Sequence, residues 1–186
     1  LKVSPPLLLC IGGLSGTGKS TAAMALAPSI GAPPGAIHVR SDVERKVLAG
    51  VAETDRLPPE SYSRQSSFEV YAACLARAER ALKAGQSVIL DAVFAREVER
   101  NSAAEVARRT RAHFAAAWLE TLPDIRARRI ASRSGDASDA TPGVIASQRG
   151  YDLGTLDWPR IGAGGSAAET LSRRRGMVPY RSCGPA

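Results

Sequence analysis

Short apolar runs of strand length alternate along the chain with longer segments in which apolar residues recur every three or four positions. The apolar runs predict strands at residues 7–11, 36–40, 87–91, 112–119 and 157–161. The segments between them predict helices, and strands that alternate with helices form a parallel sheet covered on both faces. The pattern therefore predicts an α/β protein with a three-layer α/β/α fold and a parallel sheet of about five strands.

The helix predicted over residues 62–84 has the clearest periodicity. Its apolar positions share one face, which we expect in the core: Phe68, Tyr71, Leu75, Ala78 and Leu82. Another helix is expected from Ser41, because Ser41 and Glu44 have the spacing of a capping box. Pro123 suits the first position of a helix that runs to about Arg133.

The first apolar run leads into Gly13–Ser20, which matches G-x-x-x-x-G-K-[ST] at every fixed position. Glycines allow backbone N–H groups to surround a phosphate, and the N-terminus of the following helix adds favourable partial charge. Lys19 would reach the β- and γ-phosphates of ATP. We expect the ATP-binding residues to be Gly13, Leu14, Ser15, Gly16, Thr17, Gly18, Lys19, Ser20 and Thr21.

Two carboxylates follow predicted strands. Asp42 comes after the second strand and Asp91 ends the third, so both should lie beside the phosphate loop at one edge of the sheet. Asp42 could accept a proton from an acceptor hydroxyl or orient it, and Arg45 could bind an anionic acceptor. Asp91 and the hydroxyl of Ser20 are the expected Mg²⁺ ligands. The alternative role for Asp42 is stabilisation of the helix dipole beside a capping neighbour, and the alternative for Asp91 is capping of the next turn. The sequence leaves open which of the two is the base.

Arginines near residue 130 suggest a lid over the nucleotide. Arg126, Arg129 and Arg133 share a helical face by their spacing, ahead of a loop rich in Gly, Ser and Asp. Guanidinium groups can stabilise charge on a transferring phosphoryl group, although a solvated basic helix would have the same pattern. We expect the catalytic residues to be Lys19, Asp42, Arg129 and Arg133, with Arg129 also contacting ATP.

The composition of the chain limits which classes of binding partner are expected. The chain carries 25 basic and 18 acidic residues, a net +7, which admits a nucleic-acid partner, but aromatic residues for base stacking make up only 5%. A small-molecule acceptor is therefore favoured over nucleic acid. No apolar run approaches the ~20 residues of a membrane span, so we expect no membrane association. The cysteines, three in number and without metal-ligand spacing, predict a reduced, cytoplasmic setting.

The motifs together resemble the small P-loop kinases, which include the gluconate, shikimate and adenylylsulfate kinases and the 5′-hydroxyl polynucleotide kinases. Residues 12–21, 40–46, 91–94 and 136–140 are similar to a bacterial family of predicted kinases. That family is grouped with AAA family ATPases and is often fused behind an aminoglycoside-phosphotransferase-like domain. The resemblance covers roughly residues 5–165 and implies a P-loop NTPase fold, with Asp42 and Arg45 handling the acceptor. Asp136 and Asp139, in the last segment, are interpreted as loop caps.

These observations predict a kinase that uses ATP and Mg²⁺ to phosphorylate a hydroxyl of a small molecule. Its domain is expected over residues 1–175, with a disordered tail over residues 176–186. A nucleotide-dependent switch or assembly ATPase is an alternative, disfavoured because Ala92 follows Asp91 where motor-type ATPases have a glutamate. A polynucleotide-kinase-like end-processing enzyme is a second alternative, suggested by the net charge.

Overall fold

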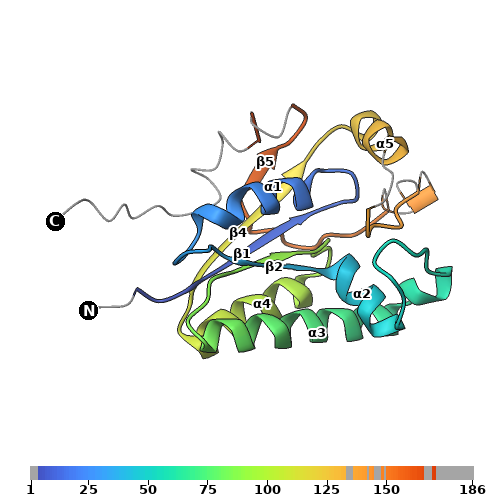
Figure 1. The fold of residues 1–186 in the computed structure, drawn as a ribbon. Coiled ribbons are helices and arrows are strands. Elements are labelled where there is room, and N and C mark those ends of the chain that lie inside the picture. Colours follow the sequence, from blue (N-terminus) through green and yellow to red (C-terminus); the bar gives the residue numbers. More distant parts are fainter. Residues whose placement is uncertain are drawn as a thin grey trace.

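The computed structural model describes residues 4–132, 136–141, 143–144, 148, 150–165 and 169–170. Five parallel strands form one sheet in the order β2-β3-β1-β4-β5 (Figure 1). Their bounds are β1 Leu7–Gly13, β2 Ile37–Arg40, β3 Val88–Asp91, β4 His113–Glu120 and β5 Arg160–Gly162. The predicted parallel α/β sheet is confirmed. The predicted boundary at residue 175 and the tail over 176–186 lie outside the described residues.

Helices cover both faces of the sheet, as Figure 1 shows. Side chains alternate along β1, so Leu8 and Cys10 pack toward α3 and α4, while Leu9 and Ile11 pack toward α1. The three predicted layers are therefore confirmed. The helices are α1 Lys19–Leu26, α2 Ser41–Ala49, α3 Arg64–Lys83, α4 Glu97–Thr110 and α5 Pro123–Ala131, with 3₁₀ turns η1 Ala27–Ser29 and η2 Pro59–Tyr62.

The apolar face of α3 differs from the prediction at its N-terminal end. Phe68 is 68% exposed, whereas the residues at four-residue spacing, Val70, Cys74, Ala78 and Leu82, are buried. At 3.6 residues per turn Phe68 lies on nearly the opposite side of α3 from Val70, so it faces away from the core. Ala78 and Leu82 are buried as predicted, and Tyr71 and Leu75 pack at the edge of the same core cluster.

The capping box predicted at the start of α2 does not form. Ser41 is the first residue of the helix, and Arg40 takes the N-cap position without a side-chain cap. Glu44 is buried and pairs with Arg77 of α3 instead. An interhelix ion pair therefore uses the carboxylate that the spacing assigned to capping. Pro123 is the first residue of α5, as predicted.

The strand order places the expected functional residues together. β1, which leads into the phosphate loop, lies beside β3, which ends at Asp91, and β3 lies beside β2, which leads to Asp42. Parallel strands point their carboxyl ends to the same edge, so these three segments meet there. Among the described residues, no helix has the length and apolar character needed to cross a bilayer.

Candidate active site

The phosphate loop, residues 13–20, connects β1 to the first turn of α1 as the motif predicts. Gly16 has φ +83°, and a Cβ there would lie 2.8 Å from the backbone oxygen of Arg126. Glycine is therefore needed for α5 to approach the loop this closely. Lys19 is the first residue of α1, and its Nζ donates to the backbone oxygen of Leu14 at 3.3 Å. Thr21, expected to bind ATP, is exposed on α1.

The two expected magnesium ligands lie together. The hydroxyl of Ser20 donates to Oδ2 of Asp91 at 2.5 Å, and Nε2 of His38 lies 3.3 Å from the same oxygen. Burial would raise the pKa of Asp91, but the hydrogen bond from His38, the charge of Lys19 and the hydrogen bond from Ser20 together lower it. Mg²⁺ in nucleotide sites takes one or two protein oxygens beside phosphates and waters. An ionised carboxylate beside a hydroxyl fits that requirement.

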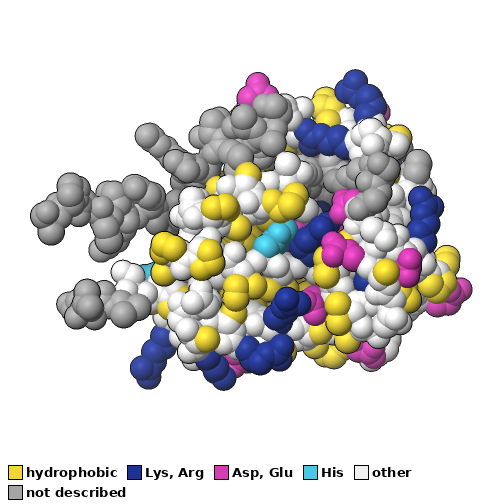
Figure 2. All heavy atoms as spheres, viewed as in Figure 1, with side chains coloured by type: hydrophobic (Ala, Val, Ile, Leu, Met, Phe, Trp, Pro, Cys, Tyr) yellow, Lys and Arg dark blue, Asp and Glu magenta, His cyan; other side chains and the backbone are white. Residues whose placement is uncertain are grey.

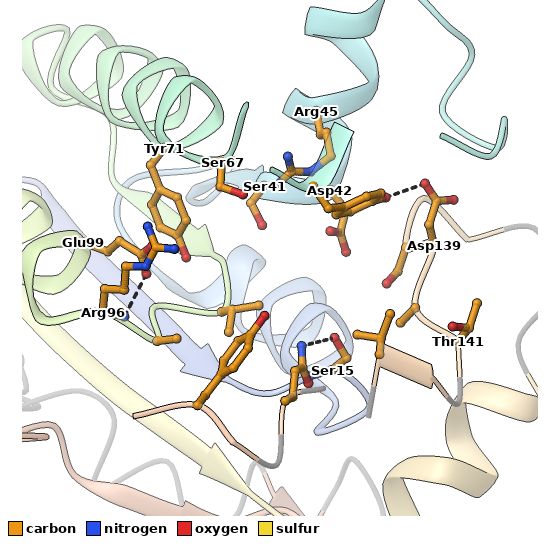
Figure 3. A pocket seen from close by; sticks show the side chains of 18 of the residues that line it. Ser15, Ser41, Asp42, Arg45, Ser67, Tyr71, Arg96, Glu99, Asp139 and Thr141 are labelled. Carbon is orange, nitrogen blue, oxygen red and sulfur yellow. Dashed lines mark hydrogen bonds between the residues drawn. The ribbon is translucent and has the colours of Figure 1, made fainter. Parts of the chain in front are cut away.

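Asp42 and Ser15 of the phosphate loop both line a cavity of about 700 Å³ (Figure 3). Burial raises the pKa of the Asp42 carboxyl and the nearby charge of Asp91 raises it further, while Lys19, Arg40 and the hydroxyl of Ser138 oppose the shift. The carboxylate thus interacts electrostatically with Lys19 and also lines the cavity. A carboxylate with a raised pKa in this position suits proton transfer from a hydroxyl.

Arg45, the other expected acceptor residue, also lines this cavity. Its Nη1 donates to the backbone oxygen of Ser61 at 2.5 Å, and its guanidinium lies 4.6 Å from the ring centre of Tyr62. These contacts fix the side chain in the cavity wall rather than leaving it in solvent. The structure thereby brings Asp42 and Arg45 to one cavity, as the sequence predicts.

Two of the arginines expected in the lid, Arg126 and Arg129, contact the phosphate loop. Arg126 is 4% exposed and donates from Nε to the backbone oxygen of Ser15 at 2.7 Å, so it supports the phosphate loop. Arg129 donates from Nη1 to the oxygen of Thr17 at 3.3 Å and from Nη2 to that of Gly165 at 2.7 Å. Arg129 therefore lies against the loop that is expected to bind ATP. Arg133 lies outside the described residues.

Two aspartates expected to cap a loop form ion pairs at the edge of the cavity. Asp136 accepts from Nη2 of Arg40 at 2.7 Å. Asp139 accepts from Nζ of Lys46 at 2.6 Å and from the hydroxyl of Tyr62 at 2.5 Å, the latter drawn in Figure 3. Both carboxylates thus bind cations from β2 and α2, and Asp139 also accepts the backbone N–H of Leu57 at 3.1 Å, as a loop cap does. Residues 138–141 consequently form part of the cavity lining.

Sequence reasoning missed Lys46 and Gln148. Lys46 is 1% exposed although a lysine on a short helix is ordinarily a surface residue. Gln148 is 5% exposed, and its side chain contacts the phosphate loop at Ser15. The only available signal for Lys46 was its place within the segment 40–46 that resembles kinases. No local pattern marks Gln148, because its partner is 133 residues away.

Solved structures with similar folds include a sugar kinase from Janibacter sp., with TM-score 0.68, 16% identity and coverage of 96% of each chain. A gluconokinase from Sinorhizobium meliloti has TM-score 0.57 and 18% identity, over 93% of this chain and 90% of that one. The APS kinase of Mycobacterium tuberculosis in complex with AMPPNP and APS has TM-score 0.62 and 19% identity, over 92% of this chain and 96% of that one. At these identities the similarity establishes the fold alone.

Uncharacterized proteins of Mycobacterium tuberculosis and Mycobacterium bovis are 34% identical to this chain over 154 residues. The match covers 79% of this chain but only 30% of those proteins, so the chain spans less than a third of the length of these curated relatives. A family model described as "AAA domain" (AAA_33) matches residues 8–151. That match covers the phosphate loop, Asp42 and Asp91. The chain therefore belongs to the AAA_33 family.

Proposed function

We propose that the protein is an ATP-dependent phosphotransferase that moves the γ-phosphoryl group of ATP to a hydroxyl of a small molecule. The observation that carries this proposal is the position of Asp42. Its carboxylate interacts electrostatically with Lys19 and lines the 700 Å³ cavity. It therefore lies where the phosphoryl donor, ATP, and the acceptor hydroxyl must meet. A cavity of this size is in the range that binds metabolites. The fold shared with solved sugar and APS kinases supports the same class of reaction.

In the proposed reaction, the hydroxyl oxygen of the acceptor attacks the γ-phosphorus while the bond from that phosphorus to the β-phosphate oxygen breaks. Asp42 orients the hydroxyl and takes its proton, and ADP leaves. Lys19 binds the β- and γ-phosphates, and Arg129, which already contacts the loop at Thr17, stabilises the phosphoryl charge. Most of the rate enhancement then comes from positioning and charge neutralisation.

Ser20 and Asp91 would hold Mg²⁺, which supplies a Lewis acid for the phosphate oxygens when bound. His38 and Arg40 orient Asp91 from β2, since His38 Nε2 lies 3.3 Å and Arg40 Nε 3.9 Å from its Oδ2. Asp91 is thus held as an ionised ligand, whereas burial favours proton uptake at Asp42. We therefore assign the base to Asp42 and the metal to Asp91.

The test is the rate of ADP formation with and without a panel of hydroxylated metabolites. We expect one chemical class of acceptor to raise turnover above the basal rate, and Lys19→Ala to abolish the increase. A basal rate that no acceptor changes would refute the phosphotransferase. ATP-dependent self-association, measured by light scattering, would then favour the switch or assembly ATPase.

Phosphorylation of nucleic-acid ends remains the second candidate acceptor chemistry. On the face shown in Figure 2, the described Lys and Arg side chains are spread around the surface rather than gathered into one stripe. A nucleic-acid site ordinarily has a continuous basic patch. Labelling of a 5′-hydroxyl oligonucleotide at low salt distinguishes this acceptor from a small molecule.

The greater length of the curated relatives is consistent with a fused phosphotransferase-like domain, which we propose as a partner.

A further inference from the structure

Ser15, the third residue of the phosphate loop, is held on three polar atoms by side chains from two distant segments. Its backbone N–H donates to Oε1 of Gln148 at 3.0 Å, and its hydroxyl accepts from Nε2 of Gln148 at 3.0 Å. Its backbone oxygen accepts from Nε of Arg126 at 2.7 Å. Gln148 and Arg126 are also joined to each other, at 2.7 Å. The dashed line at Ser15 in Figure 3 marks the hydrogen bond to its hydroxyl.

Ser15 is also the point where the phosphate loop meets the cavity. All residues of the loop, 13–20, are described, and of these Ser15 alone lines the cavity that contains Asp42. The γ-phosphate is the part of ATP that must touch both the donor loop and the acceptor. Ser15 therefore borders the place of the terminal phosphate, and Gln148, which lines the same cavity, lies beside it.

We propose that Gln148 is the positioning residue for the terminal phosphate of ATP, an inference that rests on the proposed phosphotransferase function. The amide of Gln148 is buried, and both its oxygen and its nitrogen hydrogen-bond Ser15. The phosphate loop therefore has its conformation at Ser15 before the nucleotide binds. Such preorganisation avoids reorganisation during transfer. A neutral amide performs this without opposing the charge of the phosphate, whereas a carboxylate at the same place would repel it.

The test compares affinities for the ATP analogue AMPPNP and for ADP by calorimetry with Mg²⁺. Gln148→Glu keeps the acceptor atoms for Ser15 and Arg126 but adds a negative charge at the terminal phosphate. We expect AMPPNP to bind about tenfold more weakly and ADP to change by less than about twofold, because only AMPPNP carries the group beside residue 148. Gln65→Glu makes the same chemical change on the exposed face of α3, and should leave both affinities unchanged.

Gln148→Met removes both polar groups at similar volume and provides a second variant. We expect its AMPPNP affinity to fall more than its ADP affinity, and its ADP formation in the presence of an acceptor to slow without a matching rise in the KM for ATP. Equal weakening of both nucleotides, or failure of both variants to fold, would show a structural role and overturn the inference. If the unmodified protein binds neither nucleotide, the proposed function itself fails, so the two failures are distinguishable.

Discussion

Removing the buried lysine of α2, Lys46, should strongly destabilise the fold. Lys46 is 1% exposed, and its Nζ lies 2.6 Å from Asp139, whose side chain is 11% exposed. Breaking a buried ion pair by removing one partner costs about 3–5 kcal/mol, because the remaining charge is left uncompensated. Asp139 would keep the hydroxyl of Tyr62 and the N–H of Leu57 as donors in Lys46→Met. We therefore place the loss at the low end, about 3 kcal/mol.

The free energy of unfolding, from urea denaturation at pH 7, measures this loss. For a chain of this size, 1 kcal/mol shifts Tm by about 2–4 °C, so Lys46→Met should melt about 6–12 °C lower. Lys83→Met is the control, because Lys83 is 63% exposed and pairs with Glu79 on the surface. The control should change by no more than about 1 kcal/mol. A loss below about 1 kcal/mol in Lys46→Met would refute the reasoning that its removal leaves the charge of Asp139 buried without its cation.

The same pair predicts a pH dependence. Burial would raise the pKa of Asp139, but the hydrogen bonds from Lys46, Tyr62 and Leu57 outweigh it and hold the pKa below the ordinary 3.8. A carboxylate with a lowered pKa in the folded state stabilises the fold above its unfolded pKa, and that stabilisation is lost as pH falls through the folded value. The difference in stability between the unmodified protein and Lys46→Met should therefore narrow below about pH 4. A constant difference down to pH 2 would contradict the shift.

Three further outcomes follow from the site and its support. Lys19→Ala should abolish phosphoryl transfer, whereas Asp42→Asn should lower turnover while leaving ATP affinity nearly intact; equal loss of ATP affinity in both would mean that Asp42 has another role. Gly16→Ala should eliminate ATP binding in calorimetry, because a Cβ 2.8 Å from a backbone oxygen at φ +83° forces the loop to move. Tyr71→Phe should lower the free energy of unfolding by about 1–3 kcal/mol, because the hydroxyl accepts the backbone N–H of Phe94 at 2.7 Å; unchanged urea denaturation would refute this.

The parts of the site that are predictable from sequence are those that depend on neighbouring residues or on the order of strands and helices. The phosphate loop is contiguous, and the alternation of strands with helices determines which ends of the strands face it. That reasoning places Asp42, Asp91 and Ser20 at one edge, where the structure has them. Arg126 shows its limit: helical spacing gives the face of a residue but not what lies opposite. The close approach of α5 to Gly16 turns this arginine inward to the loop.

The sequence by itself determined the order of strands and helices, the loop for a triphosphate and the carboxylates at the strand ends, because each depends on neighbouring residues or on periodicity. Only the tertiary structure decided how the cavity that Asp42 lines is closed. Lys46 with Asp139, and Ser15 with Gln148, are 93 and 133 residues apart. Such pairs leave no periodic trace, since their partners meet only in the folded protein, where Asp139 lies against α2 and Gln148 against the phosphate loop. The phosphate loop is thus a local feature of the chain, whereas the cavity beside it is a product of the whole fold.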